Sequence, residues 1–187
     1  MGGFSLIELM FAVVLLGVLT ALAVPTFNGY VRNSQVRAAT GSIENGLKLA
    51  RAEAMRRSRT VVFYLTNANP AAGVNANANG VNWVIETVPR IGGEDPEFVQ
   101  SGRWRDSAPL TSVTGPTAVC FGALGSPLTN FTALSGRGIN CNTATLPVYN
   151  ITATGGDRPL RVRVNASGHA RWCDPARTFS STNPDGC

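Results

Sequence analysis

The stretch Gly3-Phe4-Ser5-Leu6-Ile7-Glu8-Leu9 opens the longest apolar segment of this chain. The 23 residues between Glu8 and Arg32 carry no charge. The run from Phe4 to Val24 has 21 residues, and a helix of that length spans about 31 Å, close to the thickness of a hydrocarbon core. We therefore predict a transmembrane helix over residues 4–24.

Glu8 lies inside this apolar segment. A carboxylate is costly in lipid unless it has a partner or lies near the interface, so Glu8 is a candidate functional residue. The alternative on physical grounds alone is a charge at the membrane edge that reaches polar surroundings. The residue pattern leaves both interpretations open.

The motif from Gly3 to Leu9, with the apolar run and Pro25 behind it, resembles the class III signal of type IV pilins and type II secretion pseudopilins. The resemblance implies that a prepilin peptidase cuts between Gly3 and Phe4, removes the leader of residues 1–3 and methylates the new N-terminus at Phe4. It also implies a partner for Glu8 in filament assembly, namely the free amine of a neighbouring subunit's first residue. A buried charge is tolerated only when it is matched in this way.

After Pro25 the apolar pattern becomes one-sided, which predicts an amphipathic helix over residues 25–58 that lies on a globular core. The apolar stripe consists of Val36, Ile43, Leu47, Ala50 and Ala54. Pro25 is expected to kink or interrupt the helix, and Gly46 to weaken it by about 1 kcal/mol relative to Ala. The arginine cluster between Arg51 and Arg59 is expected to be a solvated helix end, with a ligand site as the alternative.

Beyond Arg59 the chain consists of short β-like runs broken by turn residues, which predicts a β-sheet head over residues 59–187. The strand candidates are residues 60–66, 81–88, 97–105, 118–121, 146–154, 159–165 and 169–173. The segment 67–80 is a low-complexity run of Asn, Ala and Gly. We expect it to be too polar and flexible to pack, as a mobile hairpin tip or surface loop.

The segment from Ala50 to Arg57, running into Thr60-Val61-Val62-Phe63, resembles the FimT, FimU and GspH branch of minor pilins and pseudopilins. In that branch a long N-terminal helix packs on a β head of two sheets. The expected fold class is therefore α+β: a long helix, transmembrane in its first half and amphipathic in its second, packed on an antiparallel head. Several members carry Gly-Arg-x-Arg in the final hairpin, where this chain has Gly168-His169-Ala170-Arg171.

The charge pattern favours an anionic partner. The chain has 16 Lys and Arg against 11 Asp and Glu, and the excess gathers in residues 32–66 and 158–187. Arginine contacts to phosphate supply most nonspecific affinity for DNA. The alternative is a solvated strand face that forms salt bridges between subunits. Trp172 alternates away from this face and is expected in the core. The candidate DNA-binding residues are Arg158, Arg161, Arg163, His169 and Arg171.

The four cysteines are widely spaced and the chain has a single histidine, so disulfides in an oxidising compartment are expected rather than zinc. Four cysteines allow three connectivities, of which the pairing of sequence neighbours is favoured over the other two. Reduced thiols in a cytosolic protein are the remaining alternative. The favoured pairs are Cys120 with Cys141 and Cys173 with Cys187.

No arrangement of residues predicts an enzyme. The sequence has no Walker-type loop and no recognisable combination of nucleophile and base around its one histidine. The acids Glu94, Asp95 and Glu97 lack the spacing of a calcium loop and are expected to be solvated. We therefore expect no cofactor and no metal.

Pattern and resemblance together predict a minor pilin of a type IV pilus that is tip-proximal and primes assembly. Such a subunit is held by one span in the inner membrane and then enters an extracellular pilus, with its head in the periplasm or outside the cell. The expected partners are other pilin subunits, the inner membrane and the prepilin peptidase. One alternative is a minor pilin that binds double-stranded DNA as a receptor in natural transformation. The second alternative is a type II secretion pseudopilin.

Overall fold

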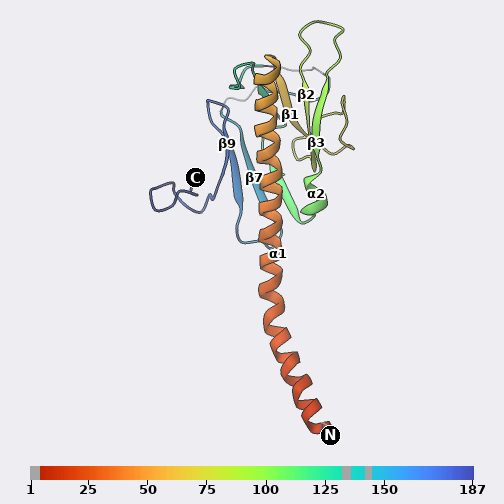
Figure 1. Cartoon of the computed structure of the whole chain (residues 1–187), viewed down its shortest axis with the longest axis vertical. Helices are drawn as coiled ribbons and strands as arrows, with labels where there is room; N and C mark the ends of the chain where they lie inside the picture. Colours follow the sequence, from red (N-terminus) through yellow and green to blue (C-terminus); the bar gives the residue numbers. More distant parts are fainter. Residues whose placement is uncertain (1–4, 132–135, 142–144) are drawn as a thin grey trace.

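The computed structural model describes residues 5–131, 136–141 and 145–187, and it describes residues 22–26 by their backbone alone. One long helix, α1 (Leu6–Arg57), is followed by a head of two antiparallel sheets (Figure 1). The C-terminal part of α1 lies against the sheets, and its N-terminal part extends away from them. This is the predicted α+β architecture.

The first sheet has five strands and the second has four, and all the strand pairings within them are antiparallel. The first contains, in spatial order, β3 (Phe98–Gly102), β2 (Asn82–Thr87), β1 (Val61–Thr66), β5 (Ala118–Phe121) and β6 (Pro127–Leu128). The second contains β4 (Thr111–Thr114), β7 (Val148–Ala153), β8 (Leu160–Val164) and β9 (Ala170–Cys173). The sequence predicted neither β4 nor β6, and the strand predicted over 97–105 ends early and gives way to α2 (Trp104–Ser107).

Both ends of α1 are capped by serines. The hydroxyl of Ser5 accepts a hydrogen bond from the backbone N–H of Glu8 at 3.3 Å, and Ser58 adopts a left-handed conformation with φ of 48°. The helix runs through position 25 without a break, so the interruption predicted at Pro25 is absent. Figure 1 shows the N-terminal part of α1 inclined to the rest.

The predicted apolar stripe of α1 is buried against the inner faces of both sheets. Its five residues from Val36 to Ala54 are at most 1% exposed. At Gly46 the helix approaches the first sheet so closely that a Cβ would lie 2.7 Å from the Phe63 ring and 3.2 Å from the Trp83 ring. Gly46 therefore does more than weaken the helix, because its missing side chain allows this approach.

The first sheet is covered on both faces, so β1 and β2 are buried along their whole length. The outer face forms a second apolar cluster, and Val74 and Ala76 of the 67–80 segment pack against it. The backbone of that segment is also bonded, since Asn77 N donates to Leu65 O at 2.7 Å and Ala76 N to Arg137 O at 2.8 Å. The expectation that residues 67–80 are too polar to pack is wrong, because their main-chain groups find partners.

Tyr149 of β7 is fully buried, and its hydroxyl has no hydrogen-bond partner among the described residues. Burial alone raises the pKa of Tyr149, so the group is a neutral phenol. We predict that Tyr149→Phe raises the free energy of unfolding by about 1 kcal/mol, because an unsatisfied buried hydroxyl is removed. Denaturant titration of the full chain in mild detergent measures this change, with the exposed Tyr30→Phe as control. A loss of stability would contradict the prediction.

Candidate functional site

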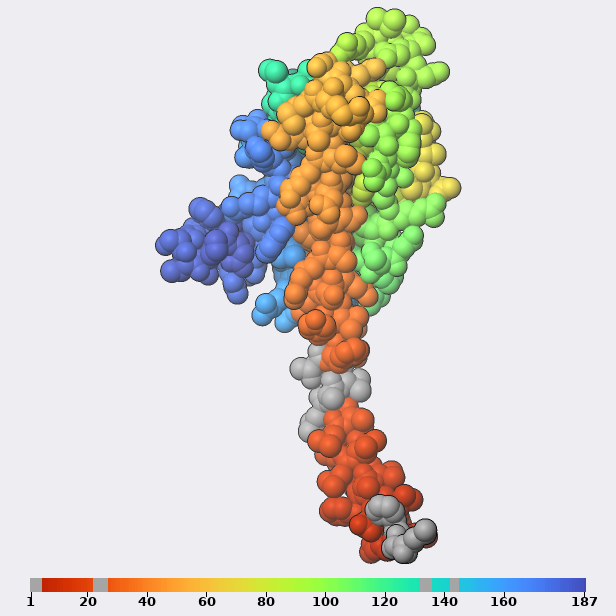
Figure 2. Space-filling view, in the orientation of Figure 1, coloured from red at the N-terminus to blue at the C-terminus, as the bar shows by residue number. Residues whose placement is uncertain are grey.

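The N-terminal part of α1 is an apolar surface that the head leaves uncovered. Eleven large hydrophobic side chains between Leu6 and Leu19 are each at least 50% exposed. Figure 2 shows this part of the helix standing clear of the head. Burying one such side chain is worth about 1.5–3 kcal/mol, so this surface favours a cover from lipid or from other helices.

Glu8 lies on this exposed helix, in its first turn. Within the described residues its carboxylate has no ion-pair partner, so the charge is available to another chain. The predicted cleavage residues Gly3 and Phe4 lie outside the described residues. No helix in the described part of the chain combines the length and hydropathy required to cross a membrane.

Three of the candidate DNA-binding residues gather on the outer face of the second sheet. Arg163 of β8 lies opposite Arg171 of β9, and Arg161 lies on the same face of β8. We call these three residues the arginine face. Their alternation is the one that the sequence predicts.

The guanidinium groups of the arginine face are already bonded within the chain. Arg161 Nε donates to Asn150 Oδ1 at 2.6 Å. Arg163 and Arg171 each donate, at 3.0 Å, to main-chain oxygens of Cys187 and Gly186, respectively. These two acceptors belong to residues 174–187, which we call the C-terminal loop. The arginine face therefore holds this loop on the sheet.

The C-terminal loop is closed by the disulfide between Cys173 and Cys187, and a second disulfide joins Cys120 to Cys141. Both are the favoured pairs of sequence neighbours. Within the loop Arg177 pairs with Asp185 at 2.9 Å.

Of the two other candidate DNA-binding residues, His169 lies next to the arginine face, one step beyond the pair of Val164 and Ala170, and Arg158 lies away from it. His169 is exposed in the turn before β9, and Arg158 lies beyond the opposite end of β8 beside Asn33 of α1. The structure therefore separates Arg158 from the four other candidates. Among its arginines, only Arg158 has a guanidinium that forms no hydrogen bond or ion pair within the described residues, although its charge acts on the neighbouring Asp157.

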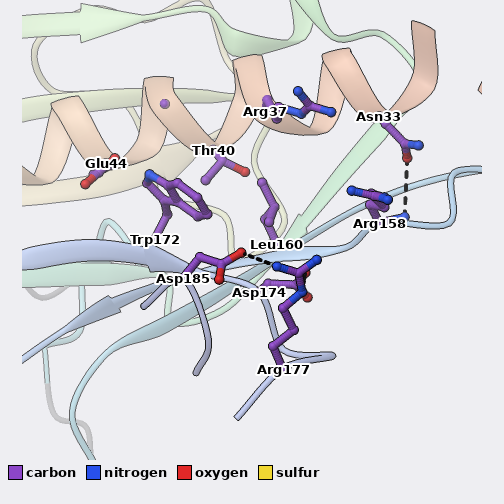
Figure 3. Close-up of a pocket in the computed structure, with 11 residues that line it drawn as sticks. Asn33, Arg37, Thr40, Glu44, Arg158, Leu160, Trp172, Asp174, Arg177 and Asp185 are labelled. Carbon is purple, nitrogen blue, oxygen red and sulfur yellow. Dashed lines mark hydrogen bonds and ion pairs between the residues drawn. The ribbon is translucent and has the colours of Figure 1, made fainter. Parts of the chain in front are cut away.

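Trp172 was expected in the core, and this expectation is wrong. It faces α1, as the alternation predicts, but 42% of its surface is exposed. The reason is that β9 is an edge strand, so no strand of the described residues pairs with it on its outer side. Its ring lines a groove of about 490 Å³ between α1 and the C-terminal loop, together with Thr40, Gly41 and Leu160 (Figure 3).

The arginines at the end of α1 form ion pairs, although Arg56 stays largely exposed, as expected for a solvated helix end. Arg57 pairs with Glu53 at 2.7 Å and with Glu97 at 2.5 Å, and Arg59 pairs with Glu94 at 2.7 Å. Two of the three acids expected to be solvated thus tie the loop after β2 to α1. Among the described residues no cluster of His, Cys, Asp or Glu could hold a metal ion.

Hydrogen bonds from Arg56 and then Arg57 lower the pKa of Glu53 to about 2, from an ordinary value of 4.5. A lowered pKa adds stability above pH 4.5 that is lost as the pH falls toward 2. Solvent screens these ion pairs in part, because Arg56 is largely exposed. We therefore expect Glu53→Gln to lower the free energy of unfolding by about 1–2 kcal/mol at neutral pH and by almost nothing near pH 2. Denaturant titrations across this range measure the difference, and a cost independent of pH would contradict the assignment.

An important buried pair escaped the sequence analysis. Glu86 of β2 is fully buried and pairs with Arg137 at 2.7 Å, and its other carboxylate oxygen accepts from Tyr64 at 3.1 Å and from Gly73 N at 3.3 Å. A charged residue directly after the apolar run Trp83-Val84-Ile85, inside a predicted strand, was the signal that could have revealed it.

A long helix with an uncovered apolar N-terminal part, packed on a two-sheet head with disulfides, is the architecture of pilin subunits. The type IV minor pilin FimU of Pseudomonas aeruginosa has this fold, with a TM-score of 0.54 over 78% of this chain and 96% of that chain at 14% identity. Residues 39–168 match the family model described as type II transport protein GspH, and the chain belongs to this family. Proteins of this kind are structural and not enzymes, as predicted from the sequence.

Relatives by sequence are fimbrial proteins. A fimbrial protein of Dichelobacter nodosus is 42% identical over 87 residues, which cover 46% of this chain and 51% of the relative. The type IV major fimbrial protein FimA of Dichelobacter nodosus strain VCS1703A is 31% identical over 86 residues, covering 46% of this chain and 50% of FimA. The chain thus spans about half the length of the curated relatives that it matches.

Proposed function

We propose that this chain is a minor subunit of a type IV pilus, anchored in the inner membrane by residues 4–24 before it enters the filament. The observation that carries the proposal is the uncovered apolar surface of α1 between Leu6 and Leu19. In a membrane, lipid covers this surface, and in a filament the same surface is covered by the helices of neighbouring subunits.

Processing and assembly follow from the same segment. The prepilin peptidase cuts between Gly3 and Phe4 and methylates Phe4. Glu8, whose carboxylate has no ion-pair partner within the described residues, pairs with the amine of a neighbouring subunit's first residue. In a water-free filament core, losing one partner of this pair costs far more than at a surface, because it leaves the other charge buried and unmatched. A tip-proximal position that primes assembly belongs to this proposal.

A secretion pseudopilin is the second candidate, and the match to the GspH family model supports it. The DNA-receptor function receives less support, because all three guanidinium groups of the arginine face are bonded within the chain. A pilus subunit is needed for surface pili and a pseudopilin for enzyme secretion, so the two functions can be separated in one strain.

The test is deletion of the gene in its native strain, followed by counting of surface pili and assay of type II secreted enzymes. We expect far fewer pili and normal secretion, with recovery by the wild-type gene but not by Glu8→Val. Glu8→Asp, which keeps the charge, serves as the matched variant and is expected to recover piliation in part. Normal piliation with impaired secretion would overturn the pilus assignment in favour of the pseudopilin.

A further inference from the structure

The end of the head nearest the N-terminus brings α1 together with the turn between β7 and β8 (Figure 1). Arg32 Nη1 donates to Thr154 O at 2.7 Å, and Asn33 Nδ2 donates to Asp157 Oδ1 at 2.6 Å. Arg158 N completes this connection by donating to Asn33 Oδ1 at 3.3 Å. We call this region, residues 30–37 and 154–158, the base of the head.

The base of the head contains an open pocket of about 550 Å³ lined by residues of both segments, including Tyr30, Arg37 and Arg158. The guanidinium groups of Arg37 and Arg158 have no hydrogen-bond or ion-pair partner among the described residues. The one acid at the pocket, Asp157, is engaged with Asn33, and this hydrogen bond is the main cause of its lowered pKa. With Arg32 beside it, the pocket carries a net positive charge.

The lining of the pocket begins at Gly29 and Tyr30, on the side of the apolar part of α1. Helical side chains lean toward the N-terminus, and Figure 3 shows the Arg37 guanidinium on the side of Asn33, above Arg158. Tyr30, which lines the pocket, and Phe27, about one turn before it, are 66% and 65% exposed, respectively. Exposed aromatic residues just beyond an apolar helix are typical of the membrane interface.

The helical rise relates the pocket to that interface. At about 1.5 Å per residue, Arg32 lies ~3 Å and Arg37 ~10 Å beyond Tyr30 along the axis. An arginine side chain that leans back along the helix covers much of the longer distance. Arg158 lies beside Asn33, one turn before Arg37. A chain inserted to the level of Tyr30 therefore holds the guanidinium groups of Arg37 and Arg158 at the depth of lipid headgroups.

We propose that the base of the head binds the phosphate of an anionic phospholipid through Arg37 and Arg158 while the subunit waits in the membrane. Guanidinium groups are suited to this ligand because their donors match phosphate oxygens in a forked geometry. The inference rests on the proposed membrane anchoring. It adds a defined orientation of the head on the bilayer, which the subunit gives up when it enters a filament.

Native mass spectrometry of the full chain in mild detergent, titrated with dioleoylphosphatidylglycerol, tests the site. Each basic residue near an anionic surface contributes about 1 kcal/mol, or about fivefold. The apparent dissociation constant of the first bound lipid is therefore expected to rise roughly 25-fold in the double variant Arg37→Gln/Arg158→Gln. The matched control, Arg56→Gln/Arg90→Gln, removes two charges at the opposite end of the head and is expected to leave binding unchanged.

Three results would overturn the lipid site: unchanged binding in the double variant, equal binding of phosphatidylcholine, or full displacement of the lipid by equimolar inorganic phosphate. Reconstitution into phosphatidylcholine and phosphatidylglycerol nanodiscs separates this inference from the proposed function. A chain that does not enter the bilayer contradicts the membrane anchoring and the lipid site together. A chain that enters it but retains no phosphatidylglycerol contradicts the lipid site alone.

Discussion

Replacing Arg137 by Met is expected to lower the free energy of unfolding by about 3–5 kcal/mol, because it leaves the buried carboxylate of Glu86 without its cation. Glu86 is fully buried under the loops that cover the outer face of the first sheet. Arg137 also donates to Tyr64 Oη and to Val74 O, both at 2.9 Å. The substitution therefore loosens the 67–80 segment as well as the ion pair.

Denaturant titration of the oxidised full chain measures this loss. The double variant Glu86→Gln/Arg137→Met is expected to recover about half of it, because a neutral amide needs no cation and still accepts from Tyr64. Arg103→Met is the matched control, since among the described residues the exposed Arg103 side chain bonds Asn69 alone, and a change within about 0.5 kcal/mol is expected. Additive losses in the double variant would show that charge burial is not the cause.

Replacing Gly168 by Ala is expected to have the second largest effect. It should lower the free energy of unfolding by about 3–4 kcal/mol. Gly168 has φ of 80°, and a Cβ there would lie 1.8 Å from the main-chain oxygen of Gly125. This contact joins the hairpin before β9 to the turn between β5 and β6. Arg51 stabilises the same junction by donating to Gly125 O and Ser167 O, each at 3.2 Å.

A matched control separates the backbone cost from the steric clash. Gly73 has nearly the same φ, 79°, but a Cβ there meets nothing within 4 Å. Gly73→Ala is therefore expected to lower the free energy of unfolding by about 1–2 kcal/mol, which is the strain of holding an alanine in the left-handed conformation. Both variants are compared by denaturant titration, and equal losses would contradict the role given to the contact with Gly125.

The sequence predicted the helix, its buried stripe and seven of the strand regions because each has a periodic or β-branched pattern. It missed β4, since Thr111–Thr114 is short and lies between turn residues, and β6, which has two residues. It misjudged residues 67–80 because composition reports side chains, whereas this segment is held by its main chain.

The candidate DNA-binding site was predicted only in part, because strand alternation reports the face of a side chain but not what packs against it. Alternation placed Arg161, Arg163 and Arg171 on one face correctly, and Trp172 on the other. It could not reveal that the C-terminal loop folds back onto those arginines, or that the edge position of β9 leaves Trp172 half uncovered. The unpaired Arg37 and Arg158 lie 121 positions apart in the sequence, so no local pattern connects them.

The most direct test of the pilus assignment is mass spectrometry of pili sheared from the native strain. We predict that this chain is present in small amounts relative to the major subunit, with an N-terminal peptide that begins at Phe4 and carries one added methyl group. The Gly3→Val variant, which blocks processing, is expected to be absent from the sheared fraction and to remain in the membrane. Abundant wild-type chain in the membrane, with none in the pili or with residues 1–3 intact, would contradict the assignment.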